Sequence, residues 1–172
     1  MNLGAFSRLI DNIEAERIEH DQNTWMQDHT DVFKINPDNR WTCATSACAA
    51  GFVWLQEAPD DSIFALNHEK VYTPEEFSRY FEIDKLVNMA AEAEDWDEEN
   101  RLYEQRDTLG VRIDKWAADV LGIDSSDSAF VFYNFDGTDE TLRRLKHLMN
   151  GGHYSDYAAP GYDPDSVVSE DL

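Results

Sequence analysis

The sequence predicts a mainly helical α+β fold with a small antiparallel sheet or hairpin. Apolar residues recur every three or four positions in several segments, which is the period of an amphipathic helix. Two short β-prone runs, 63–66 and 70–72, flank the polar residues Asn67-His68-Glu69, as in a β-hairpin. The chain has 172 residues, of which 42% are hydrophobic and 12% aromatic, enough for one sizeable core. We therefore expect a single globular domain over residues 1–150.

The first half of the chain contains two expected helices on either side of a polar segment. Apolar residues at near-helical spacing predict an amphipathic helix over residues 3–18. Residues 20–39 are polar, with a turn at 37–39. A second helix, rich in small residues and expected to be buried, begins near Ala47, is capped by Thr45 or Ser46, and ends before Pro59.

The middle of the chain predicts two more helices. Thr73-Pro74-Glu75-Glu76 places a capping residue, a proline and a glutamate where a helix start favours them, and we expect this helix to reach about Phe81. A separate helix is expected over residues 84–106, with one apolar stripe that includes Trp96 and one acidic face. Residues 108–110 end it.

The last third alternates short elements with turns. We expect a strand at 111–113, a helix capped by Asp114 and closed by Gly122, and a short buried run at 129–135. Thr138 is expected to cap a final helix, whose acidic start and basic end suit the helix dipole. No Lys or Arg follows Lys146, and residues 151–172 predict an acidic tail that is mostly disordered or loosely docked.

The charge of the chain restricts its partners. Asp and Glu number 36 against 14 Lys and Arg, which gives a net charge of −22. This balance opposes direct binding to nucleic acid or to anionic membranes, and it favours a protein partner with a basic surface. Acidity that serves only solubility is the alternative. Residues 1–20 lack the basic and apolar regions of a signal peptide, and no run has the length of a transmembrane helix, so we expect a cytoplasmic protein.

Catalytic and metal-binding patterns are weak. Cys43 and Cys48 are five positions apart, and the five histidines form no metal pair at helical spacing. We expect both cysteines to be structural, because their neighbours are mainly small and uncharged and would activate a thiolate poorly. No phosphate loop, dinucleotide motif or nucleophile elbow is present. We therefore expect no metal, no cofactor and no catalytic site, with a Cys/His enzyme as the alternative.

The acidic face of the expected 84–106 helix is the best candidate for a binding surface. Carboxylates at most positions of a helix that rises about 1.5 Å per residue approach the phosphate density of duplex DNA, about one charge per 1.7 Å. Such a face could occupy a DNA-binding groove on another protein, although a solvated helix face is the simpler interpretation. The candidate partner-binding residues are Glu92, Glu94, Asp95, Trp96, Glu98 and Glu99.

An ordered set of motifs resembles a known family. The set is Asp21-Gln22-x-x-Trp25, Cys43-x-Thr45-x-x-Cys48-x-Ala50-Gly51, Trp116-Ala117-x-x-x-Leu121-Gly122, then Phe132 and a final Thr-capped helix. It is similar to a family of small proteins of actinobacterial phages, over most of residues 1–150. Ala44 and Phe52 depart from that family, which often has Gly and Trp at these positions. Residues 80–110 look like an acidic helical insertion relative to shorter members of the family. The resemblance implies phage origin and a cytoplasmic location, and implies no particular activity.

These observations together predict a phage-encoded cytoplasmic protein that binds and inhibits a host protein with a basic surface. DNA mimicry by the acidic face is one way in which it would do so. A structural homo-oligomer, such as a homodimer, whose acidity serves only solubility, is a further alternative.

Overall fold

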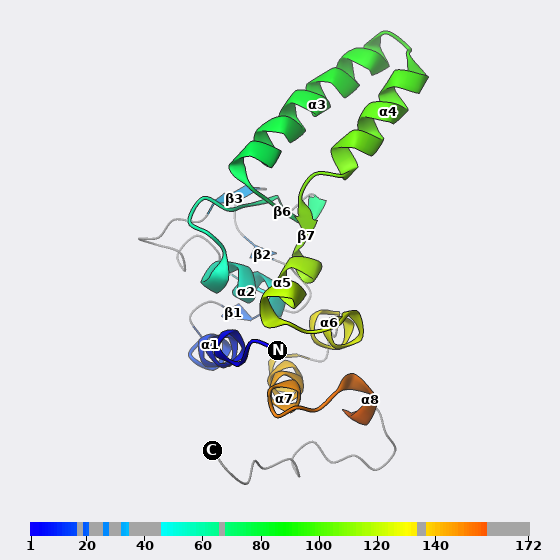
Figure 1. Cartoon of the computed structure of the whole chain (residues 1–172). Helices are drawn as coiled ribbons and strands as arrows, with labels where there is room; N and C mark the ends of the chain where they lie inside the picture. Colours follow the sequence, from blue (N-terminus) through cyan, green and yellow to red (C-terminus); the bar gives the residue numbers. More distant parts are fainter. Residues whose placement is uncertain are drawn as a thin grey trace.

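The computed structural model describes residues 1–16, 19–20, 26–27, 32–34, 46–65, 68–133 and 137–157, and only the backbone of the strands before Cys48. Within these residues the fold is a mainly helical α+β domain with small sheets, as predicted (Figure 1). Most of the polar segment 20–39, including its expected turn at 37–39, lies outside the described residues.

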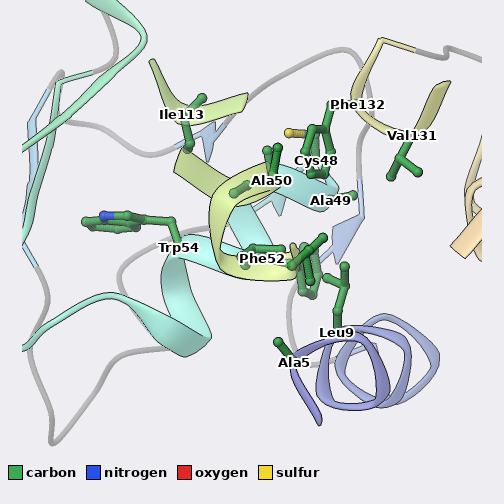
Figure 2. Packing of buried hydrophobic residues seen from close by; sticks show 14 of the residues in the cluster. Ala5, Leu9, Cys48, Ala49, Ala50, Phe52, Trp54, Ile113, Val131 and Phe132 are labelled. Carbon is green, nitrogen blue, oxygen red and sulfur yellow. The ribbon is translucent and has the colours of Figure 1, made fainter. Parts of the chain in front are cut away.

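The helix α2 (Ala49–Glu57) lies at the centre of the fold. Every residue from Ala49 to Leu55 is buried. It packs against the helices α1 (Leu3–Glu14), α5 (Ile113–Leu121) and α6 (Ser125–Phe132), and Figure 2 shows the side chains that meet around it. The predicted cap was wrong: Cys48 is the N-cap residue, and Ser46 belongs to the strand β4 (Ser46–Ala47), while Thr45 lies outside the described residues.

The helix ends around this core depend on short-range contacts. The amphipathic α1 is confirmed, but it stops at Glu14 rather than at residue 18, and Glu16 has a φ of 48°. Gly122 closes α5 in the left-handed conformation, as predicted. The expected cap Asp114 lies instead inside the first turn of α5, and Arg112 is the N-cap residue.

The last two core elements differ from their predicted starts. The buried run expected at 129–135 is the second half of α6, which begins earlier because Asp124 caps it by accepting hydrogen bonds from the amides of Ser126 and Asp127. The final core helix is α7 (Thr138–Met149). Its N-cap residue is Gly137, so Thr138 is the first helical residue rather than the cap. Asp139 and Glu140 in its first turn and basic residues in its last turn match the predicted polarity.

Two small sheets lie beside the helices. The predicted hairpin is confirmed as β5 (Ile63–Ala65) and β6 (Lys70–Tyr72), which pair antiparallel with Phe64 opposite Val71. β3 (Val32–Lys34) and β7 (Val111–Arg112) extend this pair to the order β3-β5-β6-β7. A second sheet has the order β1-β4-β2, with β1 at Glu19–His20 and β2 at Met26–Gln27.

A helical hairpin, made of α3 (Pro74–Glu92) and α4 (Trp96–Asp107), projects away from the other helices (Figure 1). We call this hairpin the arm. The predicted capping box between Thr73 and Glu76 is confirmed. The predicted helix end at Phe81 and the continuous helix over 84–106 were wrong: α3 continues to Glu92, and the chain reverses before Trp96. At about 1.5 Å per residue, the 19 residues of α3 span about 28 Å.

The base of the helical hairpin is fixed to the sheet by β6. The Lys70 ammonium donates hydrogen bonds to the carbonyl oxygens of Asp107 (2.8 Å) and Leu109 (3.1 Å). The Tyr72 ring packs against Phe77 and Tyr80 of α3, with ring centroids 5.5 and 5.8 Å apart. These contacts hold both helices of the arm on the same strand.

Residues 151–157 pack onto the helical core. They include α8 (Tyr154–Tyr157), which contacts α6. The Tyr157 ring lies 4.8 Å from the Phe130 ring, and its hydroxyl donates to the Glu140 carboxylate at 2.6 Å. This part of the predicted tail is therefore docked through its tyrosine, while residues 158–172 lie outside the described residues.

Gly110, which links α4 to β7, provides a test of how closely the base of the arm packs against Tyr72. Its φ is +68°, and a Cβ atom there would lie 2.6 Å from the buried Tyr72 ring. Gly151 also has a positive φ, +83°, but a Cβ atom there would meet nothing within 4 Å. We expect Gly151→Ala to lower the free energy of unfolding by about 1 kcal/mol through backbone strain alone. Gly110→Ala should cost about 2–4 kcal/mol, because overpacking adds to that strain.

Urea unfolding of both variants, followed by circular dichroism, measures the difference. Equal losses in the two variants would show that the Tyr72 contact does not constrain this link.

Candidate functional site

The turn between α3 and α4 brings the predicted partner-binding residues together. Glu92 ends α3, Glu94 and Asp95 lie in the turn, and Trp96, Glu98 and Glu99 lie at the start of α4. Asp97, which the prediction omitted, completes the group. We call residues 92–99 the tip, and it lies at the end of the arm that is farthest from the core (Figure 1).

The reversal at the tip has a local cause. Glu94 adopts a left-handed conformation with φ +57°, and the amide of Asp95 donates to the Ala90 carbonyl oxygen at 3.0 Å. The Asp95 carboxylate then caps α4 by accepting a hydrogen bond from the Glu98 amide at 3.2 Å. Asp at an N-cap with Glu three residues later is a recognisable helix start, so the sequence contained this signal. Asp97, Glu98 and Glu99 also suit the positive end of the α4 dipole.

The tip carries more negative charge than nearby basic side chains neutralise. Six carboxylates fall within residues 92–99, and no Lys or Arg occurs between Lys85 and Arg101. Arg101 pairs with Glu98 at 2.6 Å, and this hydrogen bond lowers the pKa of the Glu98 carboxyl. Four other carboxylates of the tip make no ion pair with another described residue: Glu92, Glu94, Asp97 and Glu99. These groups repel one another and are available to an external cation.

Trp96 is exposed, although its helical phase predicted a place on a buried stripe. Its exposed fraction is 65%, the highest among the exposed large hydrophobic residues. Leu86, Met89 and Tyr103, which lie on the same two helices, are also exposed. The arm consists of only two helices, so only residues that face the other helix are covered. Its small core is Ile83, Val87, Ala90 and Leu102.

The chain reversal removes the geometric basis for DNA-like spacing of charge. The prediction assumed that the carboxylates follow one continuous helix. Instead they surround a tight turn, with Glu92 and Glu99 on different helices. The tip is a compact acidic cluster around an indole ring, rather than a linear array of charges.

The cysteines give little support to an enzyme. Cys48 is 1% exposed inside the main core, where the structural interpretation placed it (Figure 2). A substrate would have to enter the core to reach that thiol. Cys43 lies outside the described residues.

The structure brings together one group that could hold a metal ion, which sequence spacing did not reveal. Among the described residues, one ligand atom each from Asp124, Asp127 and His153 lies within 4.8 Å of the others. His153 Nε2 is 3.2 Å from an oxygen of Asp124 and 3.7 Å from one of Asp127. Both carboxylates already accept backbone amides, from α6 and from Tyr154. The group therefore has a structural role, which is to attach residues 153–157 to the start of α6.

Comparisons of the chain with models of protein families, with curated proteins and with solved structures find no match. Among the described helices, none combines the length and the apolar character needed to cross a membrane.

His153 should make the docking of residues 153–157 depend on pH. Its hydrogen bond to Asp124, with the charges of Asp127 and Asp156, raises the pKa of His153 above its ordinary value near 6.5. A raised pKa in the folded state means that protonation stabilises docking. This contribution is fully present below pH 6.5 and is lost as the pH rises through the raised pKa.

We expect hydrogen-exchange protection factors of residues 153–157 to fall between pH 6 and pH 8.5 in the wild type. They should change less in His153→Gln, which has no titrating ring. The same fall in both proteins would mean that another group controls docking.

Proposed function

We propose that the protein binds a basic surface of another protein through the tip of the helical hairpin, and that this binding inhibits the partner. The observation that carries the proposal is an indole ring, Trp96, that is 65% exposed among six carboxylates. In agreement with the family resemblance, we place this activity in the cytoplasm of a phage-infected host cell.

The chemistry of the tip supports a protein partner in two ways. Tryptophan is the residue most typical of binding hot spots, because its large ring fills a pocket at a small cost in conformational entropy. The surrounding carboxylates complement Lys and Arg, and they accelerate encounter with a basic surface from a distance. An apolar anchor inside a charged rim is the usual anatomy of an interface.

The position of the tip also supports this function. It lies about 28 Å from the sheet along α3. The base contacts of Lys70 and Tyr72 hold the arm in place, so docking would not have to order a flexible segment. A rigid projection of this kind suits a recess on the partner.

DNA mimicry is a narrower form of the proposal. The compact shape of the tip supports it less than a continuous acidic helix would, but the negative charge of the tip remains compatible with a DNA-binding groove on the partner. Competition by duplex DNA separates the two forms, because only a mimic would share its binding groove with DNA.

A homo-oligomer remains the alternative of another class. Two copies would not meet through their tips, because like charges would then be placed together. Such an assembly would use another surface, and tip substitutions would not affect it.

The tip can be tested with matched variants in capture experiments from a host lysate. We expect Trp96→Ala to weaken capture of the basic partner by about 30-fold, as for a hot-spot residue of about 2 kcal/mol. The control is Leu3→Ala, which removes an exposed apolar side chain (57%) from α1. Neither variant should change the free energy of unfolding by more than about 0.5 kcal/mol, because both side chains are exposed.

A charge series tests the carboxylates separately. Glu92→Gln, Glu94→Gln, Asp97→Asn and Glu99→Gln together should abolish capture, and salt should weaken the wild-type interaction, because exposed charges are screened over about 10 Å at 0.1 M. The control neutralises four exposed carboxylates outside the tip: Asp11, Glu104, Asp119 and Asp139. If both quadruple variants capture the partner equally well, the tip is not the binding surface.

A further inference from the structure

A cavity of about 270 Å³ lies at the base of the helical hairpin, away from the tip. Its apolar lining includes Val71 and Tyr72 of β6, Val111 of β7 and Trp116 of α5, together with Pro59. Its polar lining includes two carboxylates, Asp61 and Glu76. The volume is slightly below the range typical of drug-sized ligands, so the cavity suits a single side chain or a similarly small group.

The walls of the cavity are held by contacts that do not depend on a ligand. Ser62, next to Asp61, accepts a hydrogen bond from the buried indole of Trp54 at 3.0 Å. Glu76 is fixed by the capping box, in which one of its carboxylate oxygens accepts the Thr73 amide at 2.9 Å. Tyr72 is 2% exposed and packs against Gly110. The Glu76 carboxylate and the residue that follows Asp61 are therefore held by contacts within the protein.

The charged residues that line the cavity are all acidic. None of the described residues that line it is basic. The nearby cations of the adjoining strands are engaged elsewhere: Lys70 with carbonyl oxygens at the end of α4, and Arg112 with Asp114 at 3.0 Å. The protein does not place one of these cations between Asp61 and Glu76.

We propose that this cavity binds a lysine side chain presented by a second polypeptide. The four methylene groups of lysine match the apolar wall, and its ammonium group matches the two carboxylates. The aromatic rings of Tyr72 and Trp116 add a surface that attracts a cation. An anion would be repelled by Asp61 and Glu76, and a neutral apolar group would gain nothing from their charge. The inference is independent of the tip, since it concerns other residues and another face of the arm.

The test uses the full chain and two small probes of nearly equal shape. Nα-acetyl-lysine methylamide carries the side-chain ammonium group, and Nα-acetyl-norleucine methylamide has a similar aliphatic side chain without it. Binding is followed by the shift of the Trp116 indole N–H signal in ¹⁵N-labelled protein, assigned with Trp116→Phe. We expect saturable binding of the lysine probe with a Kd of about 1 mM, a modest affinity suited to so few contact atoms. The norleucine probe should bind about tenfold more weakly. Equal affinities for the two probes, or no saturable shift with the lysine probe, would overturn the proposal.

Substitutions then assign the charge to the cavity rather than to the general acidity of the chain. Asp61→Asn should weaken the lysine probe about three- to tenfold and leave the norleucine probe unchanged. Glu76→Gln should act in the same way, because glutamine keeps the cap acceptor and loses only the charge. The matched control is Asp60→Asn, which changes the neighbouring residue that does not line the cavity. An equal loss in the Asp60 control would mean that the probe responds only to overall charge.

The result of the lysine-probe experiment can be distinguished from that of the capture experiments on the tip. Trp96→Ala should leave the affinity for the lysine probe unchanged, and Asp61→Asn should leave the exposed indole of the tip in place. Failure of either proposal therefore does not decide the other.

Discussion

The fold depends on the burial of α2 from Ala49 to Leu55. A helix that is apolar on every side cannot lie at a surface, so other elements must enclose it. Its first half consists of Ala49, Ala50 and Gly51, whose small side chains allow neighbouring backbones to approach closely. Its second half carries Phe52 and Trp54, which fill the space between α1, α5 and the sheet (Figure 2). The amphipathic helices α1, α5 and α7 each turn one apolar face toward this centre, and their polar faces remain in water.

The helical hairpin is stabilised differently, because it does not pack around α2. Two helices alone can cover only one narrow stripe of each, so the arm leaves apolar side chains in water that a third helix would have covered. The arm is stabilised at its base, where Phe77 and Tyr80 of α3 pack on Tyr72 of β6, and by the capped start of each helix. The same geometry that weakens its core presents Trp96 at its far end.

The distribution of cations explains why the two candidate sites are acidic. In the body, Arg8 pairs with Glu57, and Arg144 with Glu140. Lys146 likewise pairs with Glu14. An exposed pair such as Lys146–Glu14 contributes little to stability, typically about 0.2–1 kcal/mol, but all of these pairs neutralise charge locally. With only 14 Lys and Arg against 36 Asp and Glu, pairing in the body leaves a shortage of cations at the tip, where Arg101 pairs with Glu98, and at the cavity rim. Both surfaces would therefore select cationic groups, one around an exposed indole and one inside a small cavity.

The sequence by itself determined the features that depend on neighbours within about one helical turn. These include the capping box of Thr73 and Glu76, the glycine end of α5, the β5–β6 hairpin and the amphipathic pattern of α1. The six candidate residues of the tip are close together in the sequence, so they also lie close together at the turn between α3 and α4. The tertiary structure alone decided whether an apolar stripe is covered, because that depends on elements distant in the chain. Trp96 is exposed since no third helix of the described residues reaches it. Tyr157, in a segment without apolar periodicity, is docked because Phe130 and Glu140 lie beside it. The cavity likewise exists only where Asp61, Glu76 and Trp116, far apart in sequence, meet at the base of the arm.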